Sequence, residues 1–140
     1  YYGDEAGQTG DADPFNRATY PWGREDEHIL SRYRLLLDAR KACPAMREGL
    51  CGFAAPEEDV FALLRSDGDS CALALVNRSE SAKQVSLRAS DFTKGPDAGK
   101  LVLAKTLRDA LTGTRVDASG GSVNLVLPPL SGALLTDCAP

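Results

Sequence analysis

An apolar run at residues 70–78 reads SCALALVNR, and turn-forming residues flank it on both sides. Asp67-Gly68-Asp69 precedes the run, and residues 77–81 end it. Successive side chains of a strand point to opposite faces of a sheet. Both faces of this run are apolar, with Leu73 and Leu75 on one face and Ala72, Ala74 and Val76 on the other. The run is therefore predicted to be a central strand, covered on both sides.

Further β-prone runs lie on either side of this strand. We expect strands at residues 59–66, 83–88, 101–108, 122–127 and 132–136. Turn formers separate them, for example Gly95-Pro96-Asp97 and Thr112-Gly113-Thr114. Closely spaced strands without helices between them indicate an antiparallel sandwich or barrel. We therefore predict a mainly β fold, with an antiparallel β-sandwich of the Greek-key type over residues 49–140.

The pattern also predicts which side chains form the core of this sandwich. In residues 83–88 the alternation is clean, with Val85 and Leu87 facing inward. Cys71 is expected to be a small buried hydrophobe, and Phe53 and Phe61 are expected to have core roles. The predicted core residues are Val60, Leu63, Leu73, Leu75, Val76, Val85, Leu87, Leu125, Leu127 and Leu134.

One amphipathic helix is predicted over residues 26–42, ahead of the strands. Acidic residues 25–27 at its start and basic residues 40–41 at its end suit the helix dipole, and Pro44 ends it. Residues 1–25 form a long loop, in which Tyr1-Tyr2 is expected to be the end of a strand. The apolar stripe of the helix consists of Ile29, Leu30, Tyr33, Leu36 and Leu37.

Composition and charge argue against several classes of protein. No apolar run approaches the about 18 residues of a membrane-spanning helix. The net charge is −4 with acids and bases interleaved, so neither a membrane nor a nucleic-acid partner is expected. The four cysteines and the single histidine are scattered, which favours reduced thiols and argues against a metal site. The acidic residues Asp4, Glu5, Asp11 and Asp13 do not follow the EF-hand spacing, and we expect no metal and no cofactor.

Five stretches resemble the α-amylase family of glycoside hydrolases, and they occur in the family's order. The resemblance is greatest to its neopullulanase, cyclomaltodextrinase and amylopullulanase members. In the family the first three stretches belong to the end of the eighth barrel strand, the loop after it and the eighth helix, and the last two belong to the C-terminal domain. The stretches are YYGDEAG at 1–7, DPFNR with YPW at 13–22, YRLLLDAR with Pro44-Ala45 at 33–45, ALVNRS at 74–79 and LPPLSG at 127–132.

The resemblance implies that residues 1–48 are the remnant of a (β/α)8 barrel and that residues 49–140 are the C-terminal β-sandwich domain. Retaining glycoside hydrolysis needs two carboxyl groups about 5 Å apart. In the family these groups come from earlier barrel strands, which would precede Tyr1. The first residues carry no initiator Met and no signal-peptide pattern, as expected for the interior of a longer protein. The chain itself is therefore expected to be inactive.

The same resemblance places residues 13–22 on the acceptor side of a substrate cleft. Asp13, Arg17 and Trp22 are thus candidate substrate-binding residues of a complete enzyme. Without that cleft, the favoured interpretation is that Asp13-Pro14 starts a turn and that Arg17 lies on the surface.

The function that follows is that of the non-catalytic C-terminal portion of a retaining α-glucan hydrolase, acting on α-1,4 or α-1,6 bonds, with the β domain supporting the barrel. The alternatives are a carbohydrate-binding module and a structural or interaction module. Only Phe53, Phe61 and Phe92 supply aromatic rings after residue 48, which argues against a sugar platform. An α-glucan is the expected partner of the complete enzyme alone. Without a barrel, the stripe of Ile29, Leu30, Tyr33, Leu36 and Leu37 is expected either to fold back on the sandwich or to pair two chains as a homodimer, and pairing is favoured.

Overall fold

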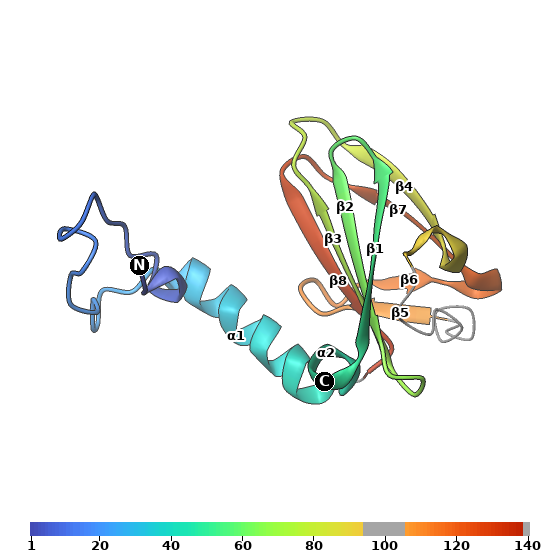
Figure 1. Cartoon of the computed structure of the whole chain (residues 1–140), viewed down its shortest axis with the longest axis horizontal. Coiled ribbons are helices and arrows are strands. Elements are labelled where there is room, and N and C mark those ends of the chain that lie inside the picture. The colour runs from blue at the N-terminus through green and yellow to red at the C-terminus, as the bar shows by residue number, and fades with distance from the viewer. Residues whose placement is uncertain (94–105, 139–140) are drawn as a thin grey trace. The chain divides into compact units, whose positions relative to one another are not determined.

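The computed structural model describes residues 1–93 and 106–138, and the chain divides into two compact units (Figure 1). Unit 1 comprises Tyr1–Leu37, and unit 2 comprises Asp38–Pro140. The long helix α1, Glu27–Ala42, begins in unit 1 and ends in unit 2. No described helix is long and apolar enough to cross a membrane.

Unit 1 is a loop followed by the first part of α1. A short 3-10 helix, η1 (Asp4–Ala6), interrupts the loop. The carboxylate of Asp26 accepts the N–H groups of His28 at 2.9 Å and Ile29 at 3.1 Å, which satisfies donors that the helix start leaves unpaired. The predicted helix is confirmed. The expected strand at Tyr1-Tyr2 is wrong, because a strand needs a neighbour to share its hydrogen bonds, and the described part of unit 1 contains none.

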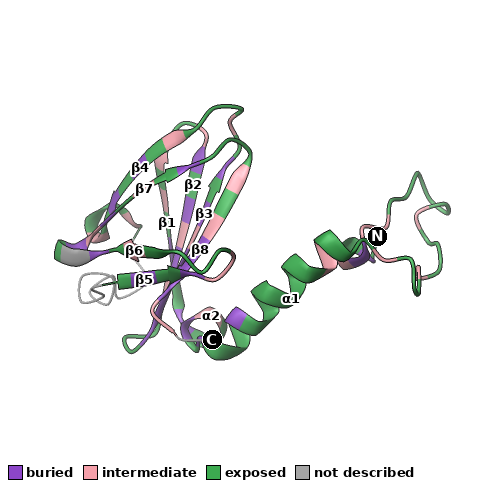
Figure 2. Cartoon of the chain, turned by 180° about the vertical axis from the view of Figure 1, so that it is seen from behind, coloured by how far each residue is buried: buried purple, intermediate pink, exposed green. Residues whose placement is uncertain are grey.

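The stripe of α1 is largely uncovered, and Figure 2 shows most of this helix as exposed. Tyr33, Leu36 and Leu37 are exposed, whereas Ile29 and Leu30 are half-buried.

The described part of unit 2 contains a short helix and eight strands in two antiparallel sheets (Figure 1). The large sheet has the order β1-β2-β3-β8-β5-β6, and β4 pairs with β7 in the small one. The chain leaves the large sheet after β3 for β4, returns to it for β5 and β6, and crosses again to the small sheet for β7. It then returns to the large sheet in β8, which pairs with both β3 and β5. The elements are α2 (Ala45–Glu48), β1 (Leu50–Glu57), β2 (Val60–Ser66), β3 (Cys71–Asn77), β4 (Lys83–Arg88), η2 (Ala89–Asp91), β5 (Thr106–Asp109), β6 (Arg115–Asp117), η3 (Ser119–Gly121), β7 (Ser122–Leu127) and β8 (Ser131–Thr136).

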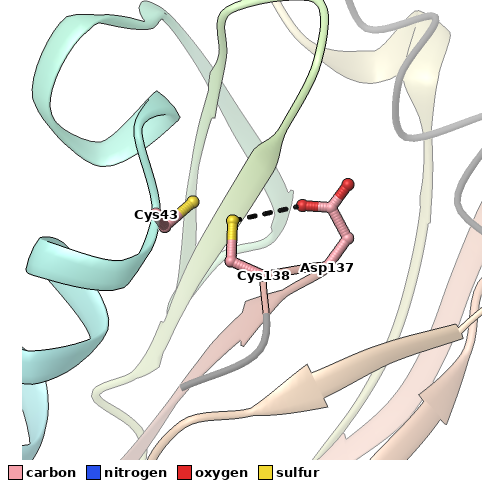
Figure 3. A group of neighbouring side chains, drawn as sticks. All are labelled: Cys43, Asp137 and Cys138. Atoms are coloured by element: carbon pink, nitrogen blue, oxygen red, sulfur yellow. Dashed lines mark hydrogen bonds between the residues drawn. The ribbon is translucent and has the colours of Figure 1, made fainter.

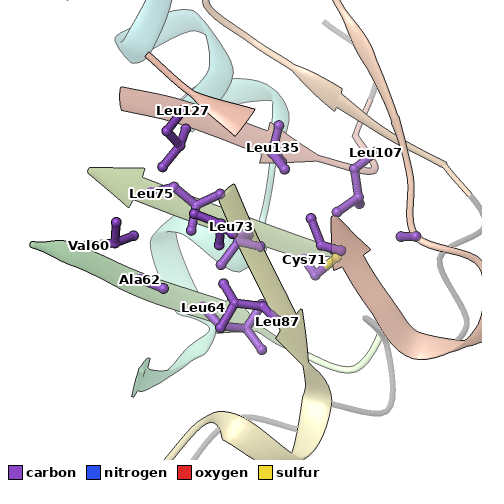
Figure 4. Close-up of a cluster of buried hydrophobic side chains, with 13 residues drawn as sticks. Val60, Ala62, Leu64, Cys71, Leu73, Leu75, Leu87, Leu107, Leu127 and Leu135 are labelled. Atoms are coloured by element: carbon purple, nitrogen blue, oxygen red, sulfur yellow. The ribbon is translucent and has the colours of Figure 1, made fainter. Parts of the chain in front are cut away.

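The core lies between the two sheets (Figure 4). Leu73 and Leu75 of β3 meet Val85 and Leu87 of β4 there, as predicted from the alternation. Cys71 is also fully buried in this cluster, which confirms its expected role. The cluster consists of Val60, Ala62, Leu64, Cys71, Leu73, Leu75, Val85, Leu87, Leu107, Ala118, Val123, Leu127 and Leu135.

Three predicted core positions are wrong. Val76 is 50% exposed, and Phe53 and Phe61 are each 47% exposed. All three belong to the face of the large sheet that points away from the small sheet, because their strand neighbours Leu75, Gly52 and Ala62 point inward. Strand parity therefore overrides hydrophobicity at these positions.

Other predicted core residues contribute less directly. Leu63 is only partly buried, as is Leu125, which packs against the core from its edge. Leu134 is buried in a second cluster with Ala39, Cys43, Ala45 and Ala72. This cluster attaches the end of α1 and the start of α2 to the large sheet.

Two strands and one helix are missing from the sequence prediction. Strand β1 contains Gly52 and Pro56 and has a register shift between Ala54 and Glu57, so its pattern is broken. Strand β6 spans three residues, and α2 spans four. In the expected strand 101–108, residues 101–105 lie outside the described residues, as does the expected turn Gly95-Pro96-Asp97, and β5 is described from Thr106.

Candidate functional site

The first candidate site is the loop of unit 1 that carries Asp13 and Arg17. Two turns shape it, since the Ala12 carbonyl accepts the N–H of Phe15 at 2.9 Å and the Pro14 carbonyl accepts that of Arg17 at 3.1 Å. Arg17 Nε then donates to Asp13 Oδ1 at 2.8 Å. Both side chains are more than half exposed, and such an ion pair contributes about 1 kcal/mol or less to stability.

Tyr1 is a member of this site that the sequence did not indicate. The guanidinium carbon of Arg17 lies 4.9 Å from the centre of the Tyr1 ring, within the range of a cation–π interaction. Tyr2 holds the same loop, because its hydroxyl donates to the Ala18 carbonyl at 2.8 Å. Arg17 is thus fixed by a carboxylate and an aromatic ring. Its fork of N–H donors suits the hydroxyl groups of a sugar.

Trp22 makes its aromatic contact with Tyr20, at 4.6 Å between ring centroids. Its side chain is 81% exposed. Burial, and then the carboxylate of Glu5, raise the pKa of Tyr20 above its ordinary value. The structure therefore joins Asp13 to Arg17, and Trp22 belongs to a separate aromatic pair.

The second candidate site is the outer face of the large sheet, defined here by Phe53, Phe61 and Val76. The rings of Phe53 and Phe61 lie 5.7 Å apart at a tilt of 40°. An open hollow of about 280 Å³ adjoins them, lined by Ala55, Glu58, Asp59, Val60, Phe61, Val76 and Arg78. This face presents a patch of apolar side chains with a charged rim, which is the usual composition of a protein contact surface.

The acidic groups of this hollow do not resemble a glycosidase pair. Glu58 and Asp59 are consecutive residues in the turn between β1 and β2. Arg78 Nε donates to Asp59 Oδ1 at 3.2 Å. Retaining hydrolysis requires two carboxyl groups on opposite sides of the bond that is cleaved, whereas one of these is committed to an ion pair at the rim.

The sequence contains a signal for the outer face. Val60, Ala62 and Leu64 alternate as buried residues in β2, so Phe61 must point the other way.

A third group of side chains brings two cysteines together in unit 2 (Figure 3). Potential ligand atoms of Cys43, Asp137 and Cys138 all lie within 4.8 Å of one another. The two cysteines are far apart in the sequence, and neither belongs to a short ligand motif, so sequence spacing could not reveal the group. A structural zinc site takes four protein ligands, whereas this group offers three.

Comparisons with known proteins relate the chain to individual proteins that act on glucans. No family model matches the chain. It is 32% identical to an amylopullulanase of Thermoanaerobacter thermohydrosulfuricus over 96% of its own length and 9% of that protein. It is 29% identical to a cyclomaltodextrinase of Geobacillus thermopakistaniensis over 92% of its length and 21% of that protein. The chain thus spans only a small part of the curated relatives it matches.

Solved structures show the same relationship. The chain matches the cyclic α-maltosyl-(1→6)-maltose hydrolase of Arthrobacter globiformis with 31% identity and a TM-score of 0.68, over 97% of the chain and 26% of that protein. An Anoxybacillus α-amylase shares the fold with a TM-score of 0.79 and 23% identity, over 100% of the chain and 28% of that enzyme. In sequence and in fold the chain therefore matches the C-terminal portion of α-amylase-family enzymes, and its β-sandwich has the fold of their C-terminal β domain.

Proposed function

We propose that the chain is the non-catalytic C-terminal portion of a retaining α-glucan hydrolase that acts on α-1,4 or α-1,6 bonds. Its β domain supports the catalytic barrel. The named relatives, amylopullulanase, cyclomaltodextrinase and neopullulanase, support the substrate class. Residues 1–48 would belong to the barrel and residues 49–140 to the supporting domain.

The observation that carries the supporting role is the outer face of the large sheet. Phe53, Phe61 and Val76 are each about half exposed on a surface that the small sheet does not cover. A contiguous apolar patch of this kind marks a contact surface. Fully burying one large apolar side chain contributes roughly 1.5–3 kcal/mol. Because these three residues are already about half buried, covering each of them adds roughly half of that amount.

The N-terminal loop has a separate role in the complete enzyme. Arg17, held by Asp13 and the Tyr1 ring, would donate hydrogen bonds to sugar hydroxyls. Trp22, with its face 81% exposed, would stack on a pyranose ring.

The test of the supporting role uses two valines that face solvent on opposite sheets. Val76 is 50% exposed on the outer face of the large sheet, and Val126 is 62% exposed on β7 of the small sheet. The chain would replace the equivalent segment of the Arthrobacter globiformis hydrolase, whose barrel then serves as the partner. We expect Val76→Ser to lower the thermal stability and soluble yield of this chimera, and Val126→Ser to leave both unchanged. In the isolated chain both variants should lie within about 0.5 kcal/mol of the parent. Equal effects of the two changes in the chimera would contradict the proposal.

A carbohydrate-binding module is the second candidate, and the exposed pair Phe53–Phe61 and the exposed ring of Trp22 favour it. Titration of the chain with maltoheptaose separates the two functions. The supporting role predicts no saturable signal at millimolar ligand, a threshold of about −4 kcal/mol. A saturating curve that Trp22→Ala or Phe61→Ala abolishes would establish the binding module instead.

A further inference from the structure

Cys43 and Cys138 face each other where the start and the end of unit 2 meet (Figure 3). Cys43 lies between α1 and α2, and Cys138 follows β8. Cys43 is fully buried, and Cys138 is half-buried. The hydroxyl of Thr136 lies 3.5 Å from Cys43 Sγ and also donates to the Cys71 carbonyl at 3.0 Å. The two sulfur atoms therefore lie within 4.8 Å of each other, next to a hydroxyl group that a hydrogen bond holds in place.

The other two cysteines are directed elsewhere. Cys71 packs in the core between the sheets, whereas Cys43 belongs to the cluster on the opposite face of the large sheet. Cys51 is exposed, on β1 at the edge of that sheet. Among the described cysteines, the geometry thus selects one pair.

We propose that Cys43 and Cys138 form a disulfide bond that ties the segment between α1 and α2 to the end of β8. The oxidant is a low-molecular-weight disulfide. The Cys138 thiol loses its proton and the thiolate attacks a sulfur of the oxidant, which releases one small thiolate that takes up a proton. The Cys43 thiol then loses its proton and attacks Cys138 Sγ, and the second small thiolate leaves and is protonated. Two protein thiols become one disulfide, and the oxidant becomes two thiols.

The order of these steps follows from exposure. Cys138 is the more accessible sulfur, so the mixed disulfide forms there, and the buried Cys43 resolves it. Burial, and then the hydrogen bond with Cys43, raise the pKa of Cys138 to about 12. Because the thiolate is the reactive form, the folded thiol reacts slowly at neutral pH and faster as the pH rises.

A metal ion fits the group of Cys43, Asp137 and Cys138 less well than a disulfide does. Asp137 Oδ1 already accepts the N–H of Cys71 at 2.8 Å, and Cys138 Sγ lies 3.6 Å from the same oxygen. Zinc would require both thiols to be deprotonated, and the pKa of Cys138 is shifted in the opposite direction. A disulfide, in contrast to a zinc site, contains no thiolate once it has formed and requires no fourth ligand.

Trypsin and mass spectrometry on the unmodified chain test the proposal, because cleavage places each cysteine in a different peptide. Cys43 falls in 42–47, Cys51 in 48–65, Cys71 in 66–78 and Cys138 in 116–140. The reduced chain is incubated with oxidised glutathione, unreacted thiols are alkylated under denaturing conditions, and the digest is compared with and without dithiothreitol. We expect a linked species of 42–47 with 116–140 that disappears on reduction, and we expect it to form faster at pH 9 than at pH 7.

Thermal unfolding gives an independent result. The bond closes a loop of about 95 residues, so the oxidised chain should melt roughly 10 °C above the reduced chain. Cys51→Ala should keep this difference, and Cys138→Ala should remove it. A digest in which Cys43 and Cys138 are both alkylated after oxidation would overturn the proposal, as would a link to Cys51 or Cys71. Protection of the two thiols by added zinc, reversed by a chelator, would replace the disulfide with a metal site.

Discussion

Asn77 Nδ2 donates a hydrogen bond to the Pro128 carbonyl at 2.8 Å, which joins the end of β3 to the segment after β7. The same amide donates to the Ser81 carbonyl at 2.9 Å, and Asn77 Oδ1 accepts the N–H of Ser79 at 2.9 Å. Asn77 is 1% exposed. Two of the stretches that resemble the α-amylase family, ALVNRS and LPPLSG, therefore meet at one buried amide.

Replacement of Asn77 by Ala tests the importance of this amide. The change leaves buried carbonyl groups without their donor, and each unsatisfied group costs about 1–3 kcal/mol. We expect the free energy of unfolding to fall by roughly 2–4 kcal/mol in urea titrations. Asn124→Ala, at an exposed position of β7, is the control and should change it by less than about 0.5 kcal/mol. Equal values for the two variants would show that the amide is not structural.

Leu75 and Val76 are adjacent residues on opposite faces of β3, and they test the register of the sheet. Leu75 is 1% exposed, so Leu75→Ala should cost roughly 2–5 kcal/mol. Val76 is 50% exposed, and Val76→Ala should cost less than about 1 kcal/mol. Chemical denaturation of both variants measures the difference. A larger loss of stability for Val76→Ala than for Leu75→Ala would mean that β3 presents its other face to the core.

The sequence predicted the elements whose local pattern and tertiary role agree. Strands β4 and β7 match the expected residues, because Lys83–Arg88 and Ser122–Leu127 alternate and end at clear turns. Phe53 and Phe61 were assigned to the core, because hydrophobicity alone does not distinguish a core position from a surface that contacts another domain. The approach of Cys43 to Cys138 depends on packing between the first and last parts of unit 2, and no local pattern records it.

The helix stripe makes a further prediction about association. Tyr33, Leu36 and Leu37 are exposed on α1, and a contiguous apolar stripe without a barrel should pair with a second chain. We expect light scattering at tens of micromolar protein to show a dimer. Leu36→Glu should shift it to the monomer, and Ser31→Glu, elsewhere on the same helix, should not. A chain that is monomeric before either change would rule out pairing.

The turn between β2 and β3 should make stability depend on pH. Asp67 Oδ1 accepts the N–H groups of Ser70 at 2.7 Å and Asp69 at 3.0 Å. The hydrogen bond from the Ser70 N–H, together with the one from the Asp69 N–H, holds the pKa of Asp67 below its ordinary value of 3.8. A lowered pKa in the folded state stabilises the fold above the ordinary pKa, and the contribution disappears as the pH falls through the lowered value.

Asp67→Asn removes this titration and leaves an oxygen acceptor in place. The variant should melt below the parent at pH 7, and the two melting temperatures should converge as the pH falls through the lowered pKa of Asp67. A difference that persists unchanged at low pH would mean that the Asp67 charge is not its cause.

The proposed supporting role implies that this chain does not itself hydrolyse glucans. Release of reducing sugar from maltooligosaccharides, β-cyclodextrin, pullulan and starch tests it most directly, with the purified chain at high concentration. We expect no release above a buffer blank, because retaining hydrolysis needs two carboxyl groups on opposite sides of the scissile bond, and the chain spans only 9% of the amylopullulanase and 26% of the hydrolase that it matches. Sugar release that increases with the amount of chain, and that follows the chain through purification, would contradict the account.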